Sequence, residues 1–201
     1  MIVSDILGAV RPVVDALDRL GVRHHVGGSV ASSALGIARS TLDVDLVADL
    51  RSDHVDDLVL ALERDYYIDG DMIRDAIRRR SCFNVIHLAT MLKVDIFVLG
   101  QRPYDLIAFS RAAPVTLEED PDARSYLLAS AEDTILNKLE WYELGGRVSD
   151  RQWGDVLGVL RVRGHALDLT YLRHWADELG IAGLLERALV EAGPGDRRHQ
   201  R

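Results

Sequence analysis

The sequence has a single cysteine, no low-complexity run and no long uninterrupted apolar segment. One cysteine in 201 residues cannot form an internal disulfide, which excludes a disulfide-stapled secreted scaffold and favours a reducing compartment. Charged residues interrupt the apolar pattern of the first 20 residues, so this stretch is typical of neither a signal-peptide core nor a membrane span. We therefore expect a soluble, cytoplasmic protein that does not bind membranes.

Positive charge, and lysine in particular, is also scarce. The chain has 24 basic and 32 acidic residues, for a net charge of −8, which argues against charge-driven coating of nucleic acid but leaves an RNA substrate open. Of the basic residues, only Lys93 and Lys138 are lysine. A flexible lysine ammonium suits a phosphate that moves during a reaction, whereas the rigid arginine fork suits fixed ion pairs. Both lysines are therefore candidates for phosphate contacts.

Hydrophobic spacing divides the chain into a mixed N-terminal part and an all-helical C-terminal part. It predicts helices over 4–20, 30–37, 54–64, 71–80 and 104–111, and strands over 22–26, 42–50, 82–88 and 92–99. The last two strands suit a hairpin. Beyond residue 130 the spacing is helical throughout. We predict domains over 1–125 and 126–192 and a disordered tail over 193–201.

Three aspartates on two predicted strands form the first functional motif. Asp43 and Asp45 alternate with core-type residues, so they share one face of the strand, about 7 Å apart. Asp95 occupies the same kind of position on a second apolar strand, with Lys93 two residues earlier on the same side. Pairing the two strands would bring the three carboxylates together, and their repulsion would be relieved by a divalent cation. Hard oxygen ligands without histidine or cysteine favour Mg²⁺ or Mn²⁺.

A glycine turn precedes the aspartates and forms the second motif. Gly27, Gly28 and Ser29 lie between a predicted strand and a helix of small residues. Such a turn lets backbone N–H groups approach a phosphate, and the helix N-terminus adds partial positive charge. The fourteen residues from Ser29 to Asp43 allow one helix and a return, which would place this phosphate cradle beside the carboxylates.

Together these motifs resemble the nucleotidyltransferase superfamily of the DNA polymerase β type. The resemblance covers about residues 10 to 100 and includes Arg39 and Thr41, just before the acidic pair. Lys138 and Asp155 more closely resemble the AbiEii-type nucleotidyltransferases, many of them toxins of bacterial toxin-antitoxin or phage-defence pairs. The implied fold is α/β (α+β): a small mixed β-sheet nucleotidyltransferase core, flanked by helices and followed by an all-helical C-terminal part. The domain over 1–125 would be catalytic.

The resemblance implies a role for each matching residue. The catalytic, metal-binding residues would be Asp43, Asp45 and Asp95. The nucleotide-binding residues would be Gly27, Gly28, Ser29, Arg39, Thr41, Lys138 and Asp155, the last with its precise contribution open. From the residues alone, Lys138 could equally be a solvated lysine on an amphipathic helix, and Asp155 an exposed carboxylate opposite an apolar stripe.

The implied reaction moves a nucleoside monophosphate from an NTP, ATP among them, to an acceptor hydroxyl and releases pyrophosphate, with Mg²⁺ or Mn²⁺ as cofactor. The acceptor could be tRNA or another RNA, a protein, or a small molecule of the aminoglycoside kind, and a toxin would have a cognate antitoxin as partner. The alternative hypothesis is a non-catalytic nucleotide-binding or interaction module that keeps the fold.

Overall fold

The computed structural model describes residues 3–38, 43–117 and 123–193. The N-terminal part contains α1 (Val3–Arg19), β1 (His24–Val26), α2 (Gly28–Leu35), β2 (Asp43–Ala48), a 3₁₀ turn (Ser52–His54), α3 (Val55–Leu62), β3 (Tyr66–Tyr67), α4 (Gly70–Arg79), β4 (Cys82–His87) and β5 (Lys93–Val98). The chain continues with α5 (Pro103–Ser110), β6 (Ala113–Thr116) and β7 (Ser125–Leu128). The C-terminal helical part contains α6 (Ala131–Leu144), α7 (Asp150–Arg163), a second 3₁₀ turn (Gly164–Ala166), α8 (Leu169–Glu178) and α9 (Ala182–Ala192).

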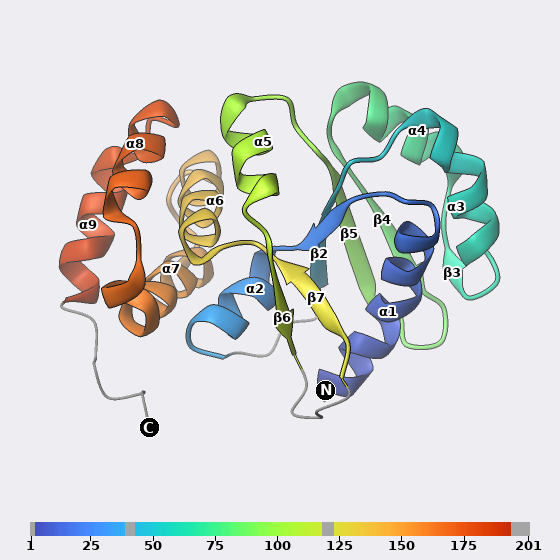
Figure 1. Cartoon of the computed structure of the whole chain (residues 1–201), viewed down its shortest axis with the longest axis horizontal. Coiled ribbons are helices and arrows are strands. Elements are labelled where there is room, and N and C mark those ends of the chain that lie inside the picture. The colour runs from blue at the N-terminus through green and yellow to red at the C-terminus, as the bar shows by residue number, and fades with distance from the viewer. Residues whose placement is uncertain (1–2, 39–42, 118–122, 194–201) are drawn as a thin grey trace.

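The described strands form one mixed sheet in the order β3-β4-β5-β2-β1-β7-β6. Strands β2 and β5 run parallel in the centre, and β4 and β5 form the predicted antiparallel hairpin. Helices flank this sheet, and four further helices follow it (Figure 1). The predicted fold class, a small mixed sheet flanked by helices and followed by a helical part, is confirmed.

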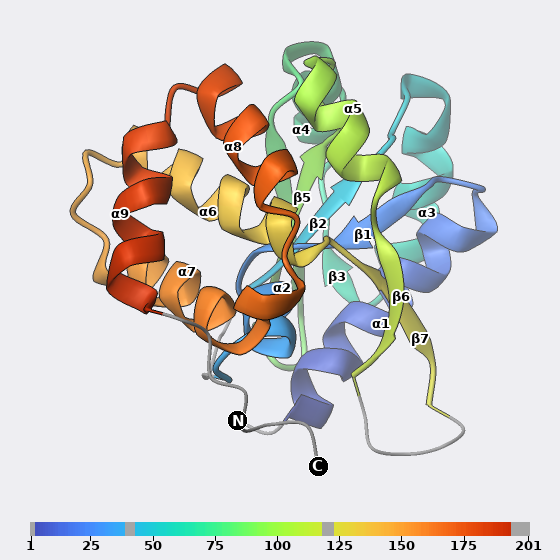
Figure 2. The ribbon, with the colours of Figure 1, turned by 60° about the vertical axis from the view of Figure 1, so that its left-hand side comes forward.

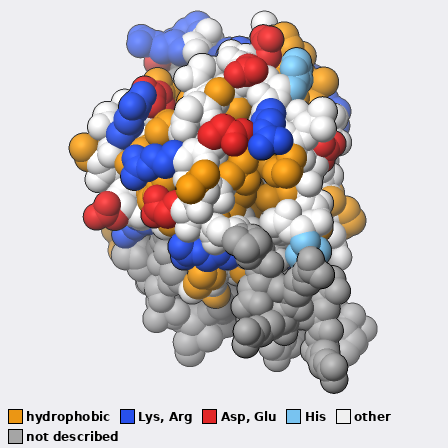
Figure 3. Space-filling model, turned by 90° about the vertical axis from the view of Figure 1, so that its left-hand side faces the viewer, with side chains coloured by type: hydrophobic (Ala, Val, Ile, Leu, Met, Phe, Trp, Pro, Cys, Tyr) orange, Lys and Arg blue, Asp and Glu red, His pale blue; other side chains and the backbone are white. Residues whose placement is uncertain are grey.

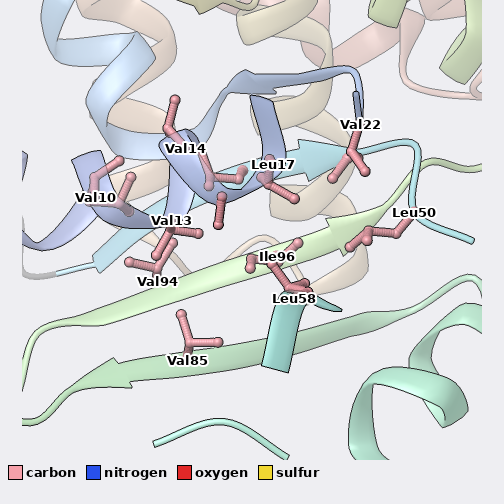
Figure 4. Packing of buried hydrophobic residues seen from close by; sticks show 14 of the residues in the cluster. Val10, Val13, Val14, Leu17, Val22, Leu50, Leu58, Val85, Val94 and Ile96 are labelled. Atoms are coloured by element: carbon pink, nitrogen blue, oxygen red, sulfur yellow. The ribbon is translucent and has the colours of Figure 1, made fainter. Parts of the chain in front are cut away.

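One hydrophobic core lies under α1, α3 and α4 on one face of the sheet. The alternating residues Val44, Leu46, Val94 and Ile96 point into it and are at most 4% exposed. Helix α1 packs its apolar side onto these strands, as Figure 4 shows for Val10, Val13, Val14 and Leu17. Because successive side chains of a strand point to opposite faces of the sheet, the residues between these core positions lie on the opposite face.

A second core joins α5 to the C-terminal helices α6 to α9. Its fully buried members include Leu136, Leu139, Val156 and Leu172. In Figures 1 and 2, α6 stands beside the sheet, and α8 and α9 lie farther from it. The predicted domain limit between residues 125 and 126 falls inside β7, and helix α5, which precedes that limit, contributes to this core.

Three short strands were not predicted. Strand β3 has two residues and β6 and β7 have four each, too few to show a period of two clearly. They also lie in the outer parts of the sheet, where burial is incomplete and the sequence is less apolar. The tail predicted to be disordered lies outside the described residues, apart from Gly193.

The surface of the helical part carries charges of both signs. On the face that includes α8 and α9, acidic and basic side chains are interspersed with apolar ones (Figure 3). Arg173 and Glu186 form one exposed ion pair between these two helices. Among the helices of the described residues, none has the length and apolar character needed to cross a bilayer.

His25 makes the stability of the fold dependent on pH. Its side chain is buried on β1 against Phe109 of α5, and its Nδ1 atom has no hydrogen-bond partner among the described residues. Burial, with a smaller contribution from His24, lowers the pKa of His25 from 6.5 to about 4. The unfolded chain therefore binds a proton between pH 6.5 and 4 that the folded chain does not, and stability falls as the pH falls through this window.

We expect this histidine to contribute up to about 3 kcal/mol of destabilisation on going from pH 7 to pH 4. Urea unfolding at a series of pH values should show a weaker pH dependence for His25→Leu than for the wild type. The matched control is His165→Leu, at an exposed position, which should follow the wild-type curve. Parallel curves for wild type and His25→Leu would contradict the prediction.

Candidate active site

The three predicted carboxylates lie on the sheet face that α5 and α6 approach. In the parallel pairing of β2 with β5, Asp45 is directly opposite Asp95, and Asp43 is opposite Lys93. Neighbouring residues in these strands point into the first core, so the aspartates share the other face. The Lys93 Nζ atom lies 2.8 Å from Asp95 Oδ2. The structure therefore brings together the acidic residues that the sequence placed on separate strands.

The glycine turn is held directly against Asp45. The Gly27 N–H donates to the Asp45 backbone carbonyl at 2.9 Å, and the Ser29 N–H donates to Asp45 Oδ2 at 3.4 Å. Gly28 has a φ of +53°, and a Cβ atom there would lie 1.6 Å from the same Oδ2 atom. The turn and the carboxylate thus occupy the space that any side chain at residue 28 would need.

We expect Gly28→Ala to destabilise the protein by about 1–3 kcal/mol and to displace the Asp45 carboxylate. The reasons are the left-handed backbone, which disfavours a Cβ, and the collision with Asp45. Denaturant unfolding measures the effect. The control is Gly154→Ala on an exposed position of α7, where a Cβ would have no neighbour within 4 Å and should add about 0.5–1 kcal/mol of stability. Equal effects at the two positions would contradict the assignment.

Lys138 and Asp155 form a buried ion pair beside the turn. Lys138 on α6 is 6% exposed and Asp155 on α7 is 8% exposed. The Lys138 Nζ atom lies 2.8 Å from Asp155 Oδ2 and 3.5 Å from Ser29 Oγ. The alternative predictions, that Lys138 is a solvated lysine and Asp155 an exposed carboxylate, are therefore wrong. Both helices are buried on more than one side, so a polar residue opposite the apolar stripe still lies inside the protein.

The surroundings of Asp45 disfavour its charge. Burial is the main cause that raises the pKa of Asp45, and the nearby Asp95 and Asp43 raise it further. The Ser29 N–H group and the Lys138 ammonium act in the opposite direction, but burial outweighs them. A carboxylate in this position gains from any additional positive charge that a ligand brings.

The donor set suits a hard divalent cation. Three carboxylates with no histidine or cysteine among them match the oxygen preference of Mg²⁺ or Mn²⁺. In their present positions, Asp45 faces the Ser29 N–H and Asp95 is paired with Lys93. Among the described residues, no group of three or more histidine, cysteine, aspartate or glutamate side chains is arranged to hold a metal ion. Arg39 and Thr41, the other predicted nucleotide contacts, lie outside the described residues.

Two aromatic residues lie beside the site: Trp141, which the sequence offers as a base-stacking or packing residue, and Phe97, which was not predicted. Phe97 lies two residues after Asp95 on β5, and Trp141 lies three residues after Lys138 on α6. Their ring centroids are 6.0 Å apart, with an interplanar angle of 62°. The available signal was their spacing from Asp95 and Lys138, which places each on the same side of its element as the site residue.

No protein-family model matches this sequence, and no curated protein matches it. Solved structures do share its fold. The antibiotic-resistance factor ANT(2″)-Ia is 14% identical, with a TM-score of 0.52 over 94% of this chain and 95% of that one. An antigenic nucleotidyltransferase-like protein from Paracoccidioides brasiliensis is 18% identical, with a TM-score of 0.51 over 96% and 95%. The chain therefore has a nucleotidyltransferase fold, while the finer AbiEii-type resemblance stays a prediction.

Proposed function

We propose that this protein is a metal-dependent nucleotidyltransferase that moves a nucleoside monophosphate from an NTP to an acceptor hydroxyl. The observation that carries the proposal is the position of Asp45, which is opposite Asp95 in the sheet and in contact with the glycine turn. A phosphate cradle and paired carboxylates are the two parts that such a transfer needs. The shared fold supports the same conclusion.

In this proposal the Gly28–Ser29 turn and the adjacent Lys138 together bind the NTP triphosphate. Asp155 holds the Lys138 ammonium in place, since the two groups are buried together. Asp43, Asp45 and Asp95 would hold Mg²⁺ or Mn²⁺, which would neutralise phosphate charge and lower the pKa of the acceptor hydroxyl. The carboxylates then remain ionised despite their mutual repulsion.

The proposed transfer needs no reagent besides the NTP and the acceptor. The acceptor oxygen forms a bond to the α-phosphorus, and the bond from that phosphorus to the oxygen bridging it to the β-phosphate breaks. Pyrophosphate leaves with the bond electrons, and the hydroxyl proton passes to the Asp95 carboxylate and then to water. Lys138 stabilises the negative charge that the leaving group gains.

Several acceptors are compatible with the sequence. The AbiEii-type resemblance supports tRNA or another RNA as acceptor and a cognate antitoxin as partner. The fold shared with an antibiotic-resistance factor supports a small molecule instead. Toxicity on expression that a neighbouring gene product cancels would support the toxin form of the proposal.

The deciding experiment incubates the purified protein with each α-labelled NTP and a cell extract, with and without Mg²⁺. We expect Mg²⁺-dependent release of pyrophosphate and label in RNA, protein or small molecules, whichever contains the acceptor. NTP binding without pyrophosphate release would overturn transferase activity and leave a non-catalytic binding module. Absence of Mg²⁺-NTP binding by calorimetry would overturn the proposal entirely.

A further inference from the structure

The Phe97–Trp141 pair presents an exposed indole beside the proposed active site. All three tryptophans of the chain belong to the described residues, and Trp153 and Trp175 are 8% and 9% exposed. Trp141 is 52% exposed, although it contacts the partly buried Phe97 ring. A single exposed apolar side chain needs no explanation, so the position of Trp141 relative to the site must carry the argument.

Two independent elements lead from the site to this pair. Along β5, Phe97 follows Asp95 on the same face at about 7 Å. Along α6, Trp141 follows Lys138 by about one helical turn, on the same side. Lys138 reaches Ser29 at the glycine turn, while Trp141 reaches Phe97 on β5. Helix α6 therefore connects the proposed triphosphate end of the site to the aromatic pair.

The strand order places the carboxylates between the two ends. The glycine turn follows β1, Asp45 lies on the adjacent β2, and Asp95 and Phe97 lie on β5 beyond it. In phosphoryl transfer the attacking and leaving oxygens lie roughly in line on opposite sides of the phosphorus. With pyrophosphate leaving on the side of the glycine turn, the acceptor must approach from the side of β5. The aromatic pair lies on the acceptor's side.

The charges near the pair disfavour a polyanionic acceptor. Lys93 is paired with Asp95, and Arg102 is paired with Glu140, the residue preceding Trp141. These two cations are each balanced by a carboxylate, whereas phosphate-rich ligands need an excess of basic side chains. An exposed indole, by contrast, offers a flat apolar surface that suits the C–H face of a sugar-like ring.

On the basis of the proposed function, we infer that Trp141, supported by Phe97, binds the ring that carries the acceptor hydroxyl. The acceptor is a hydroxylated ring compound without net negative charge, of the sugar or aminosugar type. Trp141 is a positioning residue in this inference: it holds the acceptor over Asp95 and takes no part in the bond changes.

The test compares wild type, Trp141→Ala and Trp141→Phe in the labelled-NTP assay with a cell extract. We expect label in the small-molecule fraction, and a fall of about tenfold or more in its transfer for Trp141→Ala, because the acceptor loses the apolar surface that it buries. Trp141→Phe should retain most of the transfer. The affinity for a non-hydrolysable NTP, measured by calorimetry, should be the same in all three proteins. The rate of slow NTP hydrolysis, in which water replaces the acceptor, should also be the same.

Leu144→Ala is the matched control, since Leu144 lies one turn farther along α6 and is 71% exposed. It should transfer label like the wild type. The inference is overturned if Trp141→Ala transfers normally, if its NTP affinity falls as much as its transfer, or if the label enters RNA. Each of these three outcomes leaves the proposed function standing, because the wild type still binds NTP and transfers label. Loss of NTP binding in the wild type would instead overturn the proposed function, and this inference with it.

Discussion

Asp45→Asn is expected to reduce nucleotidyl transfer by at least about a thousandfold while the protein remains folded. The substitution removes one of the charges that would hold Mg²⁺, and losses of this size, about 4 kcal/mol, are common when a key electrostatic contact is removed. The amide oxygen can still accept the Ser29 N–H. Pyrophosphate release in the presence of Mg²⁺ and NTP measures the effect.

The same variant, Asp45→Asn, should lose transfer activity without losing stability. Because burial raises the pKa of Asp45, the folded protein binds this proton more tightly than the unfolded chain. This carboxylate therefore lowers stability as the pH rises through its pKa, and the cost persists at neutral pH. Without divalent cations, Asp45→Asn should be at least as stable as the wild type at pH 7 in urea unfolding.

Asp57→Asn is the control, because it makes the same aspartate-to-asparagine change away from the site. Asp57 is an exposed residue of α3 on the other side of the sheet. We expect it to leave transfer unchanged. Normal transfer by Asp45→Asn would contradict the assignment of the site. A large loss of stability in that variant would show that Asp45 is a structural residue.

Lys138→Met is expected to destabilise the protein by about 3–5 kcal/mol and to abolish tight NTP binding. It leaves the Asp155 charge buried without the partner that lies 2.8 Å away. Asp155→Leu should have a similar effect on stability, because it leaves the lysine buried. The double variant Lys138→Met/Asp155→Leu should recover most of the stability, since apolar pairs often replace buried ion pairs without loss. It should not recover NTP binding, because no ammonium then lies beside Ser29.

Urea unfolding and calorimetric NTP titration of the four proteins separate the two roles of the pair. Arg173→Met and Glu186→Leu form the control, because that ion pair is more than half exposed and should contribute less than about 1 kcal/mol. If the double variant is as unstable as the single ones, the pair does not act as a unit. If Lys138→Met binds NTP like the wild type, the lysine is purely structural.

Local patterns in the sequence were sufficient for the central part of the site. The alternation within 42–50 and 92–99 predicted strands with aspartates on one face, and the structure has strands there over Asp43–Ala48 and Lys93–Val98. The β4–β5 hairpin and the strand-turn-helix unit at Gly27–Ser29 were predicted from neighbouring residues and are confirmed. These features depend on backbone periodicity and glycine geometry, which act over a few residues.

Long-range packing decided the rest. The sequence left open whether Lys138 and Asp155 are exposed, because burial of a helix's polar side depends on what lies beyond it, here another helix and the glycine turn. The Phe97–Trp141 contact joins residues 44 positions apart, and no local pattern specifies it. The sequence by itself therefore determined which residues are the candidates for the chemistry and on which face of its element each candidate lies. Only the tertiary structure decided which elements face one another, because that depends on strand order and helix packing across the whole chain.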